Sequence, residues 1–309
     1  LPWGSGGTGQ TSFASGFVKS NGSILSGGNT ITLADLPGST TPHIVYLKGA
    51  MNPVADCYDS LGAIITRYPG AVIVFERNVD YVCSLKVANN KIDVPAGTYL
   101  YLNGATVKFR STASNTNGFN VIGDNVTIGY GSIWFDSSST ASTGSHGGYR
   151  NPIVVGNYNN GVGYAGFTAT HLKIKHNVPD NASIYLLGNT RGWDINNISA
   201  DTLGSGALVG AHWGNADAVD SNLARSASVY TTHPHDGKIS NIMVRRHAIV
   251  GSEVVFLSSA YNVDVINVIG AEVTSLVEIT CGDYGYYYQR PFPDEYSKTT
   301  TTLQGQGIT

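Results

Sequence analysis

The chain has 309 residues, of which 41% are hydrophobic and only 13% are charged, with a formal net charge of −3. Such a chain can bury a large core, which excludes a disordered protein, and it has no basic stripe of the kind that nucleic acid requires. The 38 glycines and 18 tyrosines, set among many Ser, Thr and Asn residues, favour turns and short strands over helices. The composition therefore predicts an all-β protein without a nucleic-acid partner.

Residues 1–42 are rich in Gly, Ser and Thr and poor in bulky apolar residues, so they cannot bury much core by themselves. We expect a stalk or neck here, followed by a main domain over residues 43–309. Leu1 stands where a translated chain has Met, and the final TTTTLQGQGIT resembles a turn entering a further strand. We expect a processed or truncated chain that continues beyond residue 309. No secretion signal and no apolar run long enough for a membrane span are found.

One helix is predicted, directly after the stalk. Asn52 can cap it, Pro53 suits the first helical position, and Gly70 stops it. Between these ends, apolar residues recur at helical spacing: Val54, Cys57, Tyr58, Leu61, Ile64, Ile65 and Tyr68. We expect this apolar stripe to pack over another element of the fold.

The three cysteines, Cys57, Cys83 and Cys281, are far apart in the sequence and lack the CxxC spacing of zinc or redox sites. We expect them to be small buried hydrophobic residues without a functional role. No cofactor is predicted.

From Ala71 onward, short strands alternate with turns. Four segments share one spacing, two apolar residues separated by two others: ATHL at 169–172, INNI at 195–198, ISNI at 239–242 and VINV at 265–268. Their last residues are 26, 44 and 26 positions apart. A period in the mid-twenties predicts the coils of a parallel β-solenoid, in which each coil buries its inward residues on its neighbours.

Asn precedes the last apolar residue in three of these segments, as Asn197, Asn241 and Asn267, and His171 holds that place in the first. In stacked coils these side chains would lie above one another and could hydrogen-bond along a ladder. The interval of 44 exceeds its neighbours by 18 residues, and we place the surplus at residues 214–230 as an excursion from the coil. Excursions on a rigid scaffold are common places for binding residues.

The chain resembles a known family of proteins. These are the trimeric bacteriophage tailspikes, which degrade capsular or surface polysaccharides on a right-handed parallel β-helix. Residues 1–38 look like the GGTG and FVKSNG segments near the N-termini of phage tail fibres and spikes. Residues 89–109, with KIDVPAGTYLYLNGATVKF, look like the opening coil that follows the capping helix of such proteins. AHWG followed by THPHD is also similar to stretches of β-helical proteins that degrade polysaccharides.

The resemblance implies an all-β, right-handed parallel β-helix with one N-terminal capping helix, assembled as a homotrimer. It further implies a tailspike located on the virion and attached to the phage tail or baseplate through its N-terminal region. Its function would be to recognise the host cell and to cleave a bacterial surface polysaccharide from within, as an endo-acting depolymerase.

Hydrolysis of a glycosidic bond needs two carboxyl groups, about 5 Å apart for retention and roughly 6.5–9.5 Å apart for inversion. Glu253 and Glu278 follow the ends of ISNI and VINV by 11 and 10 residues, so we expect them on successive coils, about 4.8 Å apart. Strand alternation leaves Glu278 outside, whereas Glu253 points outward only if an irregularity lies between Val250 and Val254. We predict that both are catalytic; the alternative is a pair of solvated surface carboxylates.

His212 lies at the mouth of the excursion, and we expect it beside the carboxylates as a general acid, a base or a sugar ligand. His233 and His235 are two residues apart, with Asp236 next. These histidines could bind substrate, take part in catalysis, bind a metal or be satisfied by backbone groups in a turn. Pro234 favours a turn and weakens the metal alternative. We assign His235 to catalysis with His212, assign His233 and Asp236 to substrate binding, and predict no metal.

A polysaccharide lyase would use a base to remove the proton beside a uronate carboxylate, while a cation neutralises that carboxylate. Arg245 could bind substrate in this way. Arg246 has another interpretation, because it and Glu272 both lie 4 residues beyond their repeat segments and could pair across coils. A third possibility is an adhesin that binds the glycan and cleaves nothing.

Aromatic rings can cover the apolar face of a sugar. We predict sugar-binding residues in three places, the excursion, the segment SHGGYRNP and the cluster DYGYYYQRPF: Trp213, Tyr149, Arg150, Tyr284 and Tyr286. Trp134 and Trp193 sit in strand patterns, and we interpret them as core or coil packing.

Overall fold

The chain divides into two compact units, Leu1–His43 and Ile44–Thr309, and each is described by itself. The computed structural model describes the following residues: 17–20, 25–28, 43–48, 50–52, 55–113, 115–137, 150–157, 160–178, 182–204, 206–212, 233–247, 253–258 and 260–280. In the first unit, β1 (Phe17–Ser20) pairs antiparallel with β2 (Leu25–Gly28).

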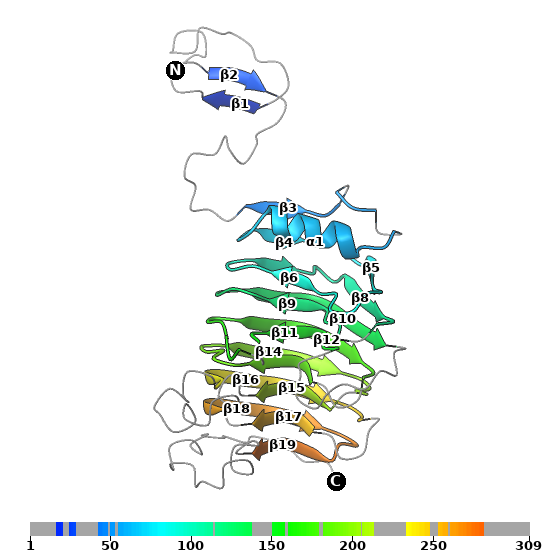
Figure 1. Ribbon diagram of the computed structural model, residues 1–309, viewed down its shortest axis with the longest axis vertical. Coiled ribbons are helices and arrows are strands. Elements are labelled where there is room, and N and C mark those ends of the chain that lie inside the picture. Colours follow the sequence, from blue (N-terminus) through cyan, green and yellow to red (C-terminus); the bar gives the residue numbers. More distant parts are fainter. Residues whose placement is uncertain are drawn as a thin grey trace. The chain divides into compact units, whose positions relative to one another are not determined.

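The described part of the second unit is mostly β, with one helix and with parallel strands stacked in successive coils, as Figure 1 shows. It is a parallel β-helix, as predicted. One sheet has ten strands: β3 (Ile44–Tyr46), β4 (Val72–Val74), β5 (Asp80–Leu85), β7 (Tyr99–Tyr101), β8 (Thr106–Ser111), β10 (Thr127–Ser137), β12 (Thr168–His176), β14 (Asp194–Ala200), β16 (His235–Val244) and β18 (Tyr261–Gly270). The other has seven: β6 (Ile92–Val94), β9 (Phe119–Val121), β11 (Ile153–Val155), β13 (Ala182–Leu187), β15 (Ala207–His212), β17 (Glu253–Ser258) and β19 (Ser275–Thr280).

The core consists of columns of apolar side chains that run through the stack. The repeat segments found in the sequence lie in register, and the residues that begin them form one such column, preceded by Ile128: Ala169, Ile195, Ile239 and Val265. All of these residues are fully buried. Each coil therefore covers the apolar side chains of the next, which explains why the period of the sequence is the period of the fold.

The predicted ladder residues stack at a bend in the ten-stranded sheet, and a hydrogen bond along the stack joins two of them, while the Asn197 and His171 side chains bond to the residue before them in their own strands. His171, Asn197, Asn241 and Asn267 all have left-handed backbone angles, with φ between 51° and 55°, and the strand pairing skips each of them. Asn267 Nδ2 donates a hydrogen bond to Asn241 Oδ1 at 2.8 Å, along the stack. Asn adopts this conformation more readily than most residues, so backbone geometry selects it together with the ladder.

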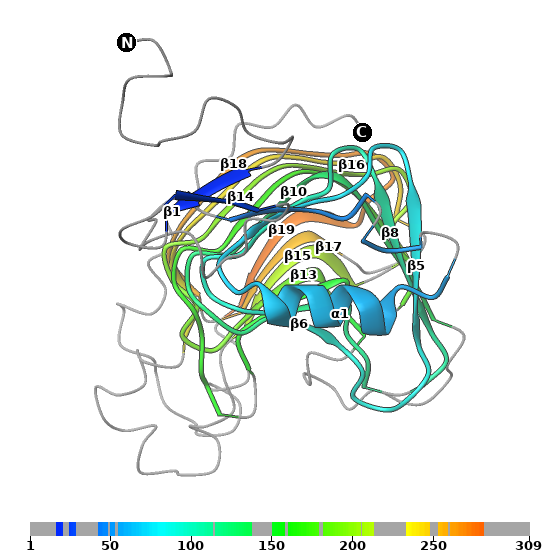
Figure 2. The same cartoon turned by 90° about the horizontal axis from the view of Figure 1, so that it is seen from above.

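One coil earlier, Tyr130 holds the ladder position, with φ of 63°. On one side of it, β10 pairs with β7, and on the other side with β8, so a single strand spans both arms of the bend that Figure 2 shows. The Tyr130 ring stacks on His171, with centroids 4.7 Å apart. Tyr130 is not among the predicted ladder residues, because its segment lacks the Asn.

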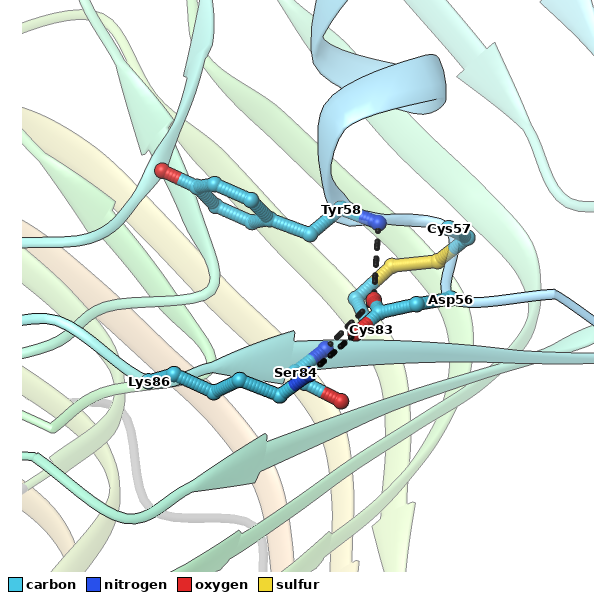
Figure 3. The surroundings of a disulfide bond; sticks show 6 residues. All are labelled: Asp56, Cys57, Tyr58, Cys83, Ser84 and Lys86. Atoms are coloured by element: carbon cyan, nitrogen blue, oxygen red, sulfur yellow. Dashed lines mark hydrogen bonds and ion pairs between the residues drawn. A yellow bond between two sulfur atoms is a disulfide. The ribbon is translucent and has the colours of Figure 1, made fainter.

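Helix α1 (Tyr58–Arg67) buries Leu61 and Ile65 and packs against β5 and β6. Its predicted start at Asn52 and Pro53 is wrong, because Cys57 occupies the N-cap position. The Asp56 carboxylate accepts hydrogen bonds from the backbone N–H groups of Tyr58 and Ser84, at 3.2 and 2.9 Å, as Figure 3 shows. These contacts tie the segment before the helix to β5. No helix among the described residues is long and apolar enough to cross a membrane.

Cys57 and Cys83 form a disulfide bond, with Cα atoms 4.7 Å apart (Figure 3). Both are fully buried, as expected, but the expectation of unbonded thiols is wrong for this pair. Their sequence separation of 26 residues equals one coil, which places the sulfur atoms on neighbouring levels of the stack. Cys281 lies outside the described residues.

Trp193 is buried in the core, as predicted, with an exposed fraction of 2%. Trp134 is not a core residue. It is half-buried on β10 and alternates with the inward-facing Ile133 and Phe135, so its ring lies on the outer face of the sheet.

We expect the Cys57–Cys83 disulfide to stabilise the first coils by restricting the unfolded chain. For a loop of 26 residues the contribution is about 3 kcal/mol. Urea unfolding with and without reductant, followed by circular dichroism, measures it. The Cys57→Ala/Cys83→Ala variant should match the reduced protein and ignore reductant; an unchanged midpoint in both cases would contradict this role.

We expect Asn241→Ala to lower the free energy of unfolding by about 2 kcal/mol, because it loses a ladder hydrogen bond and puts Ala in a left-handed conformation. Asn241→Gly loses the same bond but suits the backbone, so it should cost about half as much. Chemical denaturation of both variants checks the order. If Gly destabilises as much as Ala, backbone geometry does not select this residue.

Candidate active site

Glu253 and Glu278 lie on β17 and β19, which are adjacent strands of the seven-stranded sheet. Glu253 opens its strand, while Glu278 pairs with Phe256 in the register. Val254 and Val255 are both fully buried, so alternation is broken directly after Glu253. This irregularity sends the Glu253 side chain outward and toward Glu278. It lies at Val254 and Val255, while Val250, where we expected it to begin, is outside the described residues.

The two carboxyl groups are in hydrogen-bond contact. Burial is the largest cause that raises the pKa of Glu253 from 4.5 to about 7, followed by the hydrogen bond with Glu278 and by the Glu278 charge. The carboxyl group of Glu253 therefore keeps its proton to a higher pH than an ordinary Glu side chain. Contact is closer than the spacing expected from the sequence, and separating the groups requires only rotation about the Glu side-chain bonds.

The apolar surface beside Glu253 explains its burial. Ala207 pairs with Glu253 on the preceding coil, and Ala182 pairs with Ala207 one coil further. Both alanines are nearly fully buried and belong to a cluster of apolar residues separate from the main core, in which Tyr185 also packs. Water is excluded from one side of the carboxyl group, which favours its neutral form.

Tyr185 has space in this cluster because Gly210 pairs with it on the next coil. A Cβ at Gly210 would lie 2.7 Å from the Ala182 Cβ and 3.1 Å from the Tyr185 ring. Phe256 and then Glu278 continue the same row. An aromatic row on the outer face of the sheet therefore leads to the carboxyl pair.

His247, which is not among the predicted site residues, supports this pair from the corner between β16 and β17. Its ring Nε2 donates a hydrogen bond to the backbone carbonyl of Glu253 at 3.1 Å, and its backbone N–H donates one to the backbone carbonyl of Glu272 at 3.1 Å. Burial lowers the pKa of His247, so the ring is neutral at neutral pH. The only available signal was its position six residues before Glu253, between two strands.

His212 does not lie beside the carboxyl pair, in contrast to the prediction. It ends β15 and pairs with Ser258, whereas Glu253 pairs with Ala207 at the other end of these strands. Five residues of extended strand separate the His212 row from the Glu253 row by about 16 Å, while Glu278 pairs with Phe256, two residues before Ser258 and one strand further along the stack. The His212 side chain is buried, and its ring packs edge-on against Tyr185, with centroids 6.3 Å apart.

His235 begins β16 at the corner where His212 also lies, away from the carboxyl pair. Its Nδ1 contacts Asp236 Oδ2 at 2.8 Å, its Nε2 contacts Asn189 Oδ1 at 3.0 Å, and its ring stacks on Tyr261 at 4.8 Å. The partners are side chains, which differs from the alternative of a turn satisfied by backbone groups.

The side chains around His235 form a connected group. Asn262 Nδ2 donates a hydrogen bond to Asp236 Oδ1, and this bond is the main cause that holds the pKa of Asp236 below its usual value. His233 lies two residues before His235 and is fully buried. The predicted residues therefore separate into the carboxyl pair on β17 and β19 and a group of histidines around the end of β15 and the start of β16.

The two arginines after β16 take part in ion pairs on the surface. Arg246 Nε lies 3.3 Å from Glu272 Oε2, which confirms the predicted pair across coils. Arg245 Nε lies 3.8 Å from Asp201 Oδ1, and its side chain is 70% exposed. Both arginines are thus paired with carboxylates other than Glu253.

Arg150 is buried, with an exposed fraction of 7%, and its carbonyl accepts a hydrogen bond from His176 Nε2 at 2.9 Å. It is therefore not the accessible sugar ligand that its segment suggested. Four other predicted ligands lie outside the described residues: Tyr149, Trp213, Tyr284 and Tyr286. Within the described ranges, no three His, Cys, Asp or Glu side chains are grouped to hold a metal ion.

Among solved structures, the A-module of mannuronan C-5 epimerase AlgE6 from Azotobacter vinelandii is similar to this chain. The match covers 85% of this chain and 87% of that one, with 13% sequence identity and a TM-score of 0.36. No protein-family model and no curated protein matches the chain. Because the TM-score is low, the function rests on the chain's own residues.

We expect the stability of the protein to depend on pH through Glu253. The folded chain holds the proton of Glu253 up to about pH 7, whereas the unfolded chain loses it near pH 4.5. This contribution is therefore present at low pH and is lost as pH rises through that window. Relative to the wild type, Glu253→Gln should gain melting temperature between about pH 4.5 and about pH 7.

Thermal unfolding of the wild type and of Glu253→Gln at several pH values in this range gives the difference between their melting temperatures. The histidines titrate in both proteins, so their effect cancels in this difference. Glu272→Gln is a matched control, because it changes an exposed carboxylate on the same part of the stack. A constant offset between Glu253→Gln and the wild type at every pH would show that the Glu253 proton is not held by the fold.

Proposed function

We propose that this chain is a glycoside hydrolase that cleaves a bacterial surface polysaccharide from within. The observation that carries this proposal is the contact between Glu253 and Glu278 on the outer face of the sheet. Glycosidic hydrolysis needs one carboxyl group that keeps its proton at neutral pH and one that is ionised. The raised pKa of Glu253 supplies the first of these groups.

In this mechanism, Glu253 donates its proton to the leaving oxygen, and Glu278 acts on the anomeric carbon. The close approach of the two groups favours retention, in which Glu278 is the nucleophile and Glu253 then activates water. The proton taken up by the leaving sugar in the first step returns to Glu253 from the water in the second. His247 positions Glu253 through its carbonyl and does not touch the reacting atoms.

The biological setting that we propose is a phage tailspike acting at the surface of its host. The similarity of residues 1–38 and 89–109 to tail fibres and spikes supports this setting, together with the parallel β-helix. The proposal includes a homotrimer, a right-handed coil whose N-terminal end α1 caps, and attachment to the tail through the N-terminal region.

A lyase would require a cation beside the carboxyl pair to neutralise a uronate. Arg246 is paired with Glu272, and Arg245 lies by Asp201, so the described residues favour hydrolysis.

The expected result of Glu253→Gln or Glu278→Gln is a loss of at least about 100-fold in the rate of cleavage, because each change removes a proton donor or a nucleophile. The measurement uses a panel of purified capsular polysaccharides, with products identified by mass. A hydrolase yields new reducing ends, a lyase adds ultraviolet absorbance from an unsaturated uronate, and an adhesin releases nothing.

Glu272→Gln serves as the control and should keep wild-type activity. Wild-type activity should also fall as pH rises above about 7, where Glu253 loses its proton. Full activity in both Gln variants, with folding intact, would contradict the assignment of these residues.

A further inference from the structure

Trp134 lies between two lysines on the outer face of the ten-stranded sheet. It pairs in register with Lys108 of β8 on the coil before and with Lys175 of β12 on the coil after. The two Nζ atoms lie 4.4 and 5.1 Å from the centre of the indole ring. An aromatic ring that is still half-buried thus has a cation on each neighbouring coil.

These side chains line a cavity of about 240 Å³, with Arg110, Asp136 and Asn177 at its border. Lys108 pairs with Asp80 at 2.5 Å, and Asn177 Nδ2 donates to Asp136. Lys175 and Arg110 have no carboxylate partner among the described residues. The three cations at this cavity, Lys108, Lys175 and Arg110, therefore outnumber the two carboxylates, Asp80 and Asp136, in a chain whose net charge is −3.

Packing alone does not account for this arrangement. Each lysine gains from the negative face of the indole ring, but two ammonium groups close to one ring also repel each other. Asp80 neutralises only Lys108, so the charge of Lys175 is not balanced by this ion pair. An anion in the cavity, within reach of Lys175 and Arg110, would neutralise the second cation, and the indole face offers a flat surface for the rest of the molecule.

We propose that this pocket binds an acidic sugar unit of a polysaccharide. The sugar ring stacks on Trp134, and its carboxylate faces Lys175 and Arg110. The carboxyl pair is elsewhere, on β17 and β19 of the other sheet, so this site needs no cleavage to operate. It goes beyond the proposed hydrolase by holding a charged glycan at a second place on the coil.

Binding is tested with the folded chain carrying Glu253→Gln, which prevents cleavage. The probes are polygalacturonate, hyaluronate and polysialate, with fully methyl-esterified polygalacturonate as the uncharged counterpart of the first. Affinity electrophoresis or calorimetry at low salt measures the affinity. At least one acidic probe should bind, and the methyl ester should bind at least about 3-fold more weakly than its acid.

For that probe, Trp134→Ala should weaken binding about 10-fold, and Trp134→Phe should retain most of the affinity. Lys175→Ala should weaken binding about 3-fold. Lys238→Ala is the matched control, because Lys238 is an exposed lysine on β16 of the same sheet, and it should change nothing. Circular dichroism and melting curves confirm that each variant is folded.

Failure to bind any of the three acidic probes would overturn the proposal, as would binding that ignores Trp134→Ala. Oligothymidylate tests whether the pocket instead takes a nucleic-acid base; equal binding with the same dependence on Trp134 would overturn the sugar assignment. Cleavage is measured separately with Glu278→Gln in the otherwise wild-type chain: full cleavage by that variant would contradict the proposed hydrolase and not this site, so the two failures are distinguishable.

Discussion

Parallel hydrogen bonding between successive coils is the constraint on which the rest of this structure depends. It fixes which residue of one coil lies over which residue of the next, at a sequence separation of 26 in several coils and of more where a longer connection is inserted. Cys57 and Cys83 are 26 residues apart and are bonded, and Asn241 and Asn267 share a ladder hydrogen bond at the same separation. Lys108 also precedes Trp134 by 26 residues, and Glu253 precedes Glu278 by 25. The features that carry chemistry are thus neighbours for the same reason as the core residues.

The period explains how much of the fold could be predicted from the sequence. Four spaced apolar pairs were enough to indicate stacked coils, and the ladder and the pair of Arg246 with Glu272 followed from counting along them. The same count of 26 residues applies to the disulfide, but local spacing of the CxxC kind does not reveal a pair of cysteines one coil apart. The start of the helix could not be read either, because it depends on Asp56 contacting a strand further along the chain.

The candidate site could be predicted only in part, because the distance from a repeat segment identifies the coil but not the place along a strand. Corners between strands differ in length, so His212 and Glu253, which seemed to share a place, lie at opposite ends of paired strands. His247 has no pattern of its own, since its role is a single hydrogen bond to a backbone carbonyl. Strand alternation places Trp134 on the outer face, but its neighbours on that face come from other coils, which the local sequence does not reveal.

The left-handed backbone conformation at the ladder position limits the backbone of each coil more than it limits the side chain. The column accepts Asn in three coils and an aromatic or imidazole ring in two others, with the same backbone angle. What the coil demands at this place is a torsion, and the chemistry of the side chain is left open. Corner residues can therefore be exchanged during evolution without disturbing the layers beneath them, and each coil adds one such interchangeable position to the outer edge of the protein.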